Sequence, residues 1–223
     1  EVGGTTMIQR VVGSVLESGV TKRPVVIIGY GTEVIKKYLG TSCSYVLQAE
    51  QLGTAHAVSC AESYLTGVDN VVVINGDAPF LRPETLTKLV AAHEENQAVL
   101  TMVTLRLPDF SEWRETFYDF GRIVRNSGGE VAAIVEKKDA TPEQLKITEV
   151  NPSFFCFRAD WLWENLSKIN CDNAQGEFYL TDLVHLAISE NQKVETLVTD
   201  DPAEAVGVNT PEQLNLAQSL MEK

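Results

Sequence analysis

Asp77 is the residue whose neighbours most clearly suggest chemistry. It follows the apolar run from Val71 to Ile74 directly after Asn75 and Gly76. A buried strand that ends in such a turn brings its last side chains to the sheet edge where α/β proteins bind ligands. A carboxylate at that edge can hold Mg²⁺, which prefers hard oxygen donors and substrate phosphates. Asp also caps turns, and the local pattern leaves both interpretations open.

Three further polar positions carry weaker signals. The segment from Gln48 to Thr54 follows a short apolar run and ends in Gly-Thr before a predicted helix, which is also a common helix cap. Asn209 follows the apolar run 205–208, and Glu136 ends a predicted strand. Taken alone, Asn209 is more simply a turn residue and Glu136 a solvated strand end.

Predicted strands and helices that alternate along the chain must position these residues. Apolar runs predict strands at 24–28, 45–47, 71–74, 99–105, 150–157 and 194–198. Helical spacing predicts helices at 8–16, 34–39, 55–65, 82–93, 159–166, 181–189 and from 210 onward. This alternation favours an α/β fold with a doubly wound, mostly parallel, Rossmann-like sheet and helices on both faces.

Two irregularities interrupt that rhythm. After Leu107, a polar and aromatic excursion at 108–118 leads into two short predicted strands at 121–124 and 131–136. The chain also opens on a predicted helix with no strand before it, although the first strand of a doubly wound sheet is usually central. We therefore expect a gap in the sheet with two exposed strand edges. Neither common Gly-rich phosphate motif occurs in the sequence.

Composition excludes several classes of protein. The chain has 223 residues and a formal net charge of -13, which would repel nucleic acid and anionic membranes. No apolar stretch reaches membrane-spanning length and no signal peptide is visible, so a cytoplasmic location is expected. The four cysteines lack zinc spacing and are predicted to be free thiols. The three histidines are interpreted as ordinary core or surface residues.

Several segments together resemble the bacterial N-acetylglucosamine-1-phosphate uridylyltransferases. The stretch 47–57 is similar to their uridine-recognition loop, and 75–79 is similar to their metal-binding turn. The segments 120–125, 134–141, 173–182 and 207–209 follow in family order and span almost the whole chain. Six segments in order are far more specific than any one of them.

The resemblance implies a reaction and a set of site residues. The reaction is transfer of a uridylyl group from UTP to a sugar 1-phosphate with Mg²⁺ as cofactor, and N-acetylglucosamine 1-phosphate is the expected sugar. Asp77 and Asn209 would be the catalytic metal ligands. The nucleotide-binding residues would be Gln48, Gly53, Thr54, Asn75 and Gly76. The sugar-binding residues would be Gly121, Glu136, Asn151, Tyr179 and Thr181.

The chain also departs from the family pattern. The family's Gly-rich turn with its Arg and Lys is absent from these residues, and Asn151 is followed by Pro-Ser where the family has Thr-Gly. We therefore expect weak activity and a reshaped sugar pocket. A non-catalytic nucleotide-sugar binding module and a transferase for another sugar or nucleotide remain as alternatives. One domain is expected over 1–223, with a nucleotide part at 1–107 and a sugar part at 108–223; a homo-oligomer is compatible with the sequence.

Overall fold

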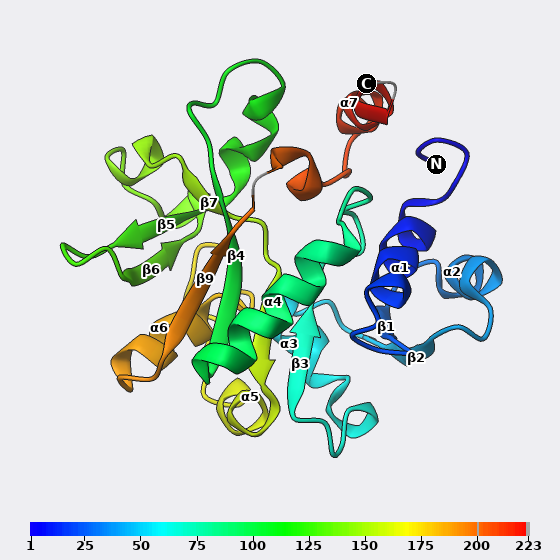
Figure 1. Cartoon of the computed structure of the whole chain (residues 1–223), viewed down its shortest axis with the longest axis horizontal. Helices are drawn as coiled ribbons and strands as arrows, with labels where there is room; N and C mark the ends of the chain where they lie inside the picture. The colour runs from blue at the N-terminus through cyan, green and yellow to red at the C-terminus, as the bar shows by residue number, and fades with distance from the viewer. Residues whose placement is uncertain (200, 222–223) are drawn as a thin grey trace.

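The computed structural model describes residues 1–199 and 201–221 (Figure 1). Helices and strands alternate over much of this range, but no α-helix lies between residues 97 and 158. The helices are α1 (Met7–Ser18), α2 (Thr32–Leu39), α3 (Thr54–Ser59), α4 (Pro83–Asn96), α5 (Ala159–Leu166), α6 (Asp182–Ser189) and α7 (Pro211–Met221). The strands are β1 (Val25–Ile28), β2 (Ser44–Leu47), β3 (Asn70–Val73), β4 (Leu100–Arg106), β5 (Gly121–Arg125), β6 (Val131–Val135), β7 (Glu149–Asn151), β8 (Phe155–Arg158) and β9 (Val194–Val198). The 3-10 turns are η1 (Glu62–Tyr64), η2 (Glu112–Asp119), η3 (Lys137–Asp139), η4 (Gln144–Lys146) and η5 (Pro202–Ala205).

The main sheet has the strand order β3-β8-β4-β7-β5-β6, and β9 pairs with β4. Strands β3, β4 and β9 run in the same direction, as an α/β fold requires. The expectation of a mostly parallel sheet is wrong in its pairings, because β8 and β7 run antiparallel to β4. After β4 the chain adds β5, β6 and β7 on one side of β4, and β8 then inserts between β3 and β4, antiparallel to both. The α/β class itself is confirmed.

Helices cover both faces of this sheet, so the doubly wound arrangement is confirmed. Period-2 alternation divides the strand residues between two cores. On β8, Phe155 and Phe157 pack with α3, α5 and α6, whereas Cys156 packs with α1 and α4. All of these side chains are buried. The apolar β-branched and aromatic runs therefore form strands that are covered on both sides.

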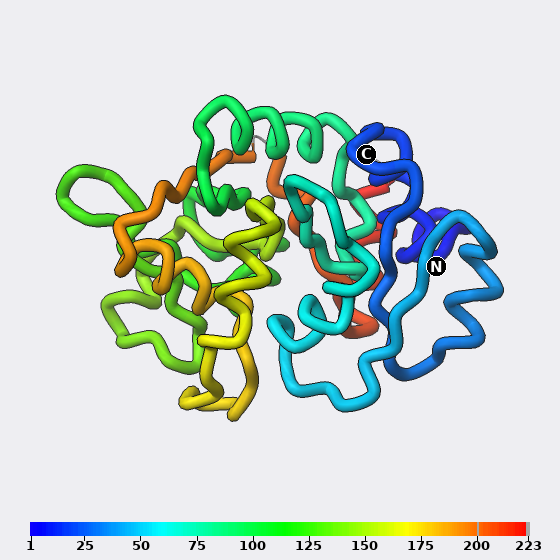
Figure 2. The backbone as a smooth tube through the Cα atoms, turned by 90° about the horizontal axis from the view of Figure 1, so that it is seen from below, coloured from blue at the N-terminus to red at the C-terminus, as the bar shows by residue number. Residues whose placement is uncertain are grey.

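A second, two-stranded parallel sheet contains β1 and β2. Among the described residues, β1 pairs only with β2 and β3 pairs only with β8. A cleft of about 800 Å³ is lined by both β1 and β3, together with α1. The expected gap between two free strand edges is therefore present. Figure 2 shows the N-terminal segment on one side of the molecule and the segment from about 120 to 195 on the other.

The excursion after β4 is held by a buried cation. Arg122 of β5 is fully buried, and its guanidinium carbon lies 4.8 Å from the ring centroid of Phe110 and 5.0 Å from that of Tyr118. Burial lowers the pKa of Arg122, while Tyr118 and Asp119 oppose the shift. Cation–π contacts of this kind fix an aromatic segment whose composition alone predicts no regular element.

Two predicted elements are each divided into two shorter ones. The predicted strand at 150–157 is two strands, because Pro152 cannot donate a ladder bond and Ser153 has a positive φ of 62°. The predicted helix at 55–65 stops at Ser59 and continues as the turn η1. No helix of the described part of the chain is long and apolar enough to cross a membrane.

Candidate functional site

The large cleft brings together most of the residues predicted for the nucleotide and the metal. It is lined by Gln48 and Thr54 from the loop after β2, by the turn after β3, and by Asn209 before α7. That turn supplies Asn75, Gly76 and Asp77. Three segments far apart in the sequence thus meet at the carboxyl end of β3, where open α/β sheets place their ligands.

Asp77 and Asn209 are in direct contact although 132 positions separate them in the chain. The Asn209 amide Nδ2 donates to Asp77 Oδ2 at 2.8 Å, and the Val208 N–H donates to the Asp77 carbonyl at 3.0 Å. Gly207 leaves room for this approach, since a Cβ there would lie 3.2 Å from Asp77 Oδ2. Rotation of the Asn209 amide would present its oxygen beside the carboxylate, so the pair fits a magnesium site with two protein ligands. No group of three or more His, Cys, Asp or Glu suited to a metal occurs among the described residues.

The loop that carries Gln48 is clamped by the segment 178–180. The Phe178 N–H donates to the Leu52 carbonyl and the Ala55 N–H donates to the Phe178 carbonyl, both at 2.9 Å. The Leu180 N–H donates to Thr54 Oγ1 at 2.9 Å. These bonds explain why two stretches, one before β3 and one before α6, build a single wall.

Gly53 is required where this clamp closes. Its φ is +118°, and a Cβ would lie 2.6 Å from the Phe178 carbonyl oxygen and 2.7 Å from the Phe178 nitrogen. Backbone atoms cannot swing aside as a flexible side chain can. Only glycine therefore satisfies both the backbone conformation and the close approach.

Gly53→Ala should lower stability by about 2–3 kcal/mol, which corresponds to roughly 5–10 °C in Tm. The control is Gly67→Ala, because Gly67 also has a positive φ of 77° but has open space around its Cβ position. Thermal unfolding followed by circular dichroism measures both variants. Equal losses of stability in the two variants would show that the close approach to Phe178 does not add to the destabilisation.

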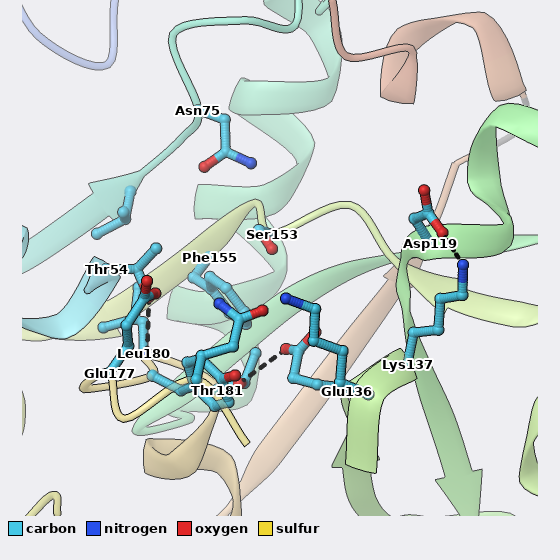
Figure 3. A pocket seen from close by; sticks show the side chains of 14 residues that line it. Thr54, Asn75, Asp119, Glu136, Lys137, Ser153, Phe155, Glu177, Leu180 and Thr181 are labelled. Atoms are coloured by element: carbon cyan, nitrogen blue, oxygen red, sulfur yellow. Dashed lines mark hydrogen bonds and ion pairs between the residues drawn. The ribbon is translucent and has the colours of Figure 1, made fainter. Parts of the chain in front are cut away.

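A second cavity of about 650 Å³ adjoins the cleft (Figure 3). Thr54, Val73 and Asn75 line both spaces and therefore form the wall between them. The predicted sugar residues that line the second cavity are Glu136, Tyr179 and Thr181. The Thr181 hydroxyl donates to Glu136 Oε1 at 3.1 Å, as Figure 3 shows.

Burial controls the protonation of this cavity. It raises the pKa of Glu136, and the hydrogen bond from Thr181 only partly offsets the shift. It also raises the pKa of Tyr179 to about 12, helped by nearby carboxylates. Tyr179 thus remains a phenol that can donate, and Glu136 can accept from a hydroxyl. Such a cavity suits a polyhydroxylated ligand.

Two predicted sugar residues do not line the cavity. Asn151 is buried, and its Oδ1 accepts from the Ser153 N–H at 3.0 Å, so its side chain stabilises the turn between β7 and β8. Gly121 lies behind the cavity, where a Cβ would be 2.9 Å from Ile134 Cγ2 and 3.4 Å from the Glu136 carboxylate oxygens. Glycine at this position leaves room chiefly for the Ile134 side chain.

The sequence reasoning missed the cations of this cavity. Lys137 and Lys138 line it, and Lys137 pairs with Asp119 at the rim (Figure 3). No ion pair is found for Lys138 within the described ranges 1–199 and 201–221. The two lysines that directly follow Glu136 in the sequence were the signal that could have predicted these cations. An acidic chain therefore still brings positive charge to this space.

Comparison with known proteins gives this geometry a family. The model of the family described as nucleotidyl transferase matches residues 1–208. The chain belongs to the nucleotidyl transferase family. The bifunctional protein GlmU of Brevibacillus brevis is 40% identical over 223 residues, and that of Halalkalibacterium halodurans is 42% identical. Both matches cover 100% of this nucleotidyl transferase chain, which spans 47% of each relative.

Solved structures of other transferases share the fold. A UDP-glucose pyrophosphorylase complexed with UDP-glucose aligns over 97% of this chain and 86% of its own, with a TM-score of 0.73 and 16% identity. The 4-diphosphocytidyl-2C-methyl-D-erythritol synthase of Anaerococcus prevotii aligns over 100% and 88%, with a TM-score of 0.70 and 16% identity. At such identities these neighbours support the fold of this nucleotidyl transferase alone.

Proposed function

We propose that this chain carries the transfer site of a UTP:sugar-1-phosphate uridylyltransferase, with N-acetylglucosamine 1-phosphate as acceptor. The observation that carries the proposal is the shared wall of Thr54, Val73 and Asn75 between two cavities. One cavity borders the paired Asp77 and Asn209 side chains, and the other offers hydroxyl, carboxylate and ammonium groups. The six ordered segments that resemble the N-acetylglucosamine-1-phosphate uridylyltransferases support a uridine nucleotide sugar as the product.

In the proposed reaction, an oxygen of the sugar 1-phosphate attacks the α-phosphorus of UTP. A bond from that oxygen to the α-phosphorus forms, the bond to the bridging oxygen breaks, and pyrophosphate leaves. The protein must align the reactants and neutralise charge, and no covalent help is needed. The proposed uridine contacts are Gln48, Gly53 and Thr54. Asn75 and Gly76 would lie along the nucleotide, and Glu136, Tyr179 and Thr181 would bind the sugar.

Mg²⁺ is the proposed cofactor, held by the oxygens of Asp77 and Asn209. When bound, the ion would neutralise negative charge on the nucleotide phosphates. Lys138 would add a cation on the sugar side, because it lines the same cavity as Glu136. We also propose that residues 1–107 serve the nucleotide, and that 108–223 bind the sugar and supply closing elements, which include Asn209.

The test is an assay of the chain with UTP, Mg²⁺ and N-acetylglucosamine 1-phosphate that measures pyrophosphate and UDP-N-acetylglucosamine. We expect slow product formation that depends on all three components, with CTP and dTTP much poorer. Binding of UDP-N-acetylglucosamine without any turnover would instead support a binding module. A faster reaction with another sugar 1-phosphate would overturn the choice of acceptor.

A further inference from the structure

We propose that His56 is a positioning residue that orients the Gln48 amide for reading a base, and so sets a preference for uracil over cytosine. The inference rests on the proposed function, because it deepens the account of the same nucleotide site. It concerns a histidine that the sequence pattern marked as ordinary.

The orientation of the Gln48 side chain is fixed by a carbonyl. Gln48 Nε2 lies 3.2 Å from the Gly53 carbonyl oxygen. A carbonyl can only accept, so the atom facing it must be the NH₂ group and not the amide oxygen. If the Gln48 amide oxygen and nitrogen were exchanged, the amide oxygen would face the Gly53 carbonyl oxygen, and both atoms are acceptors. The Gly53 carbonyl is itself held, because it accepts from the Ala57 N–H at 3.1 Å.

The second hydrogen of the same NH₂ group determines the state of His56. Gln48 Nε2 also lies 3.1 Å from His56 Nδ1. Since Nε2 is a donor, Nδ1 must accept and carries no proton, and a neutral ring then bears its proton on Nε2. His56 Nε2 lies 3.9 Å from Cys60 Sγ, which can accept that proton in a weak hydrogen bond. The chain of contacts therefore specifies one tautomer.

This arrangement leaves one group of Gln48 for a ligand. Both hydrogens of its NH₂ are used, and its Oε1 has no hydrogen-bond partner in the part of the chain that the structure describes. Gln48 lines the large cleft, so it can present an acceptor to a base there. Uracil offers an N3–H donor on its pairing edge, whereas cytosine offers an unprotonated N3 and an amino group. An acceptor held in place favours the former and repels the N3 of the latter.

Without His56 Nδ1, the Gln48 NH₂ group would lose one of the two contacts that hold it. Among the described residues, the Gly53 carbonyl would then be the single contact that holds the amide. The side chain could leave this contact for another rotamer and present NH₂ to the base, which suits cytosine. His56→Leu removes the acceptor. His56→Asn keeps one, because Asn Oδ1 sits as many bonds from Cβ as His Nδ1. Ser59→Ala is the matched control, since the Ser59 hydroxyl donates to the His56 backbone carbonyl at 2.8 Å and, among the described residues, has no hydrogen bond to the His56 ring or to Gln48.

The experiment measures UTP and CTP binding by calorimetry for the full chain and the three variants, together with ¹⁵N NMR of the His56 ring. We expect the ring to be the Nε2–H tautomer. We also expect His56→Leu to reduce the preference for UTP about tenfold, and both His56→Asn and Ser59→Ala to keep it. An Nδ1–H tautomer, or a His56→Leu variant with unchanged preference, overturns the inference. If the wild-type chain itself shows no preference for UTP over CTP, while the tautomer is as expected, the positioning holds and the uridine assignment falls.

Discussion

Replacing Asp77 by Asn is expected to lower Mg²⁺-dependent uridylyl transfer by about a hundredfold or more. Asn209 already donates to the Asp77 carboxylate, so the pair contributes a single negative charge to the cleft. Asp77→Asn removes that charge and leaves two neutral amides, which hold a divalent cation poorly. The measurement is the rate of UDP-N-acetylglucosamine formation as Mg²⁺ is titrated.

The control for the Asp77→Asn variant is a substitution of a carboxylate that precedes β3. Asp69→Asn changes an exposed carboxylate that precedes β3, at the opposite end from Asp77, and should leave the rate unchanged. A second variant, Asn209→Asp, would place two carboxylates in contact, so its Tm should rise when Mg²⁺ is added. If Asp77→Asn retains full activity at every Mg²⁺ concentration, Asp77 is not a metal ligand.

Arg82→Met is expected to destabilise the fold by about 3 kcal/mol, or roughly 6–12 °C in Tm. Arg82 Nη2 and Nε lie 2.6 and 2.9 Å from Glu204 Oε1, and the Arg82 N–H donates to Oε2 at 3.1 Å. Glu204 is only 1% exposed. Removing the guanidinium leaves a buried carboxylate with no counter-charge, and this costs more than the ion pair itself gains.

The variant has a matched rescue. Arg82→Met combined with Glu204→Gln should recover most of the loss, because the amide oxygen can accept from the Arg82 N–H in place of Oε2. Its NH₂ group can then donate to the Thr199 hydroxyl, which lies 3.1 Å from Glu204 Oε1. The turn η5 that holds Glu204 leads directly to Asn209, so Arg82→Met should also weaken Mg²⁺-dependent UTP binding. A double variant no more stable than the single one would show that packing around Arg82, and not the charge, is responsible.

Local elements could be predicted from the sequence because their causes are local. The capping box of Thr6 and Gln9 and the left-handed Gly19 define α1, and Thr210 with Gln213 begins α7. The strand order could not be predicted in this way. Nothing near Phe155 indicates that β8 lies between β3 and β4, because that placement depends on the packing of two distant cores.

In the candidate site, too, residues that follow apolar runs could be predicted from the sequence, whereas contacts between distant segments could not. Asp77 and the Gln48 loop could be found from their position after apolar runs, and the resemblance supplied Asn209 and Glu136. Asn151 was expected in the sugar cavity, but its side chain bonds to Ser153, a consequence of the intervening Pro152. His56 carried no sequence signal, since its relation to Gln48 depends on the short helix α3 folding back onto the loop.

The cleft between β1 and β3 has a consequence for the behaviour of the molecule in solution. Each free edge has unpaired backbone groups with which a further polypeptide strand can form hydrogen bonds. Burial of the apolar side chains along the cleft would stabilise such a strand. The net charge of -13 opposes it between like molecules, because identical chains repel one another. Salt screens this repulsion but leaves the free edges unchanged. We therefore expect any strand-paired association of this chain to increase with ionic strength.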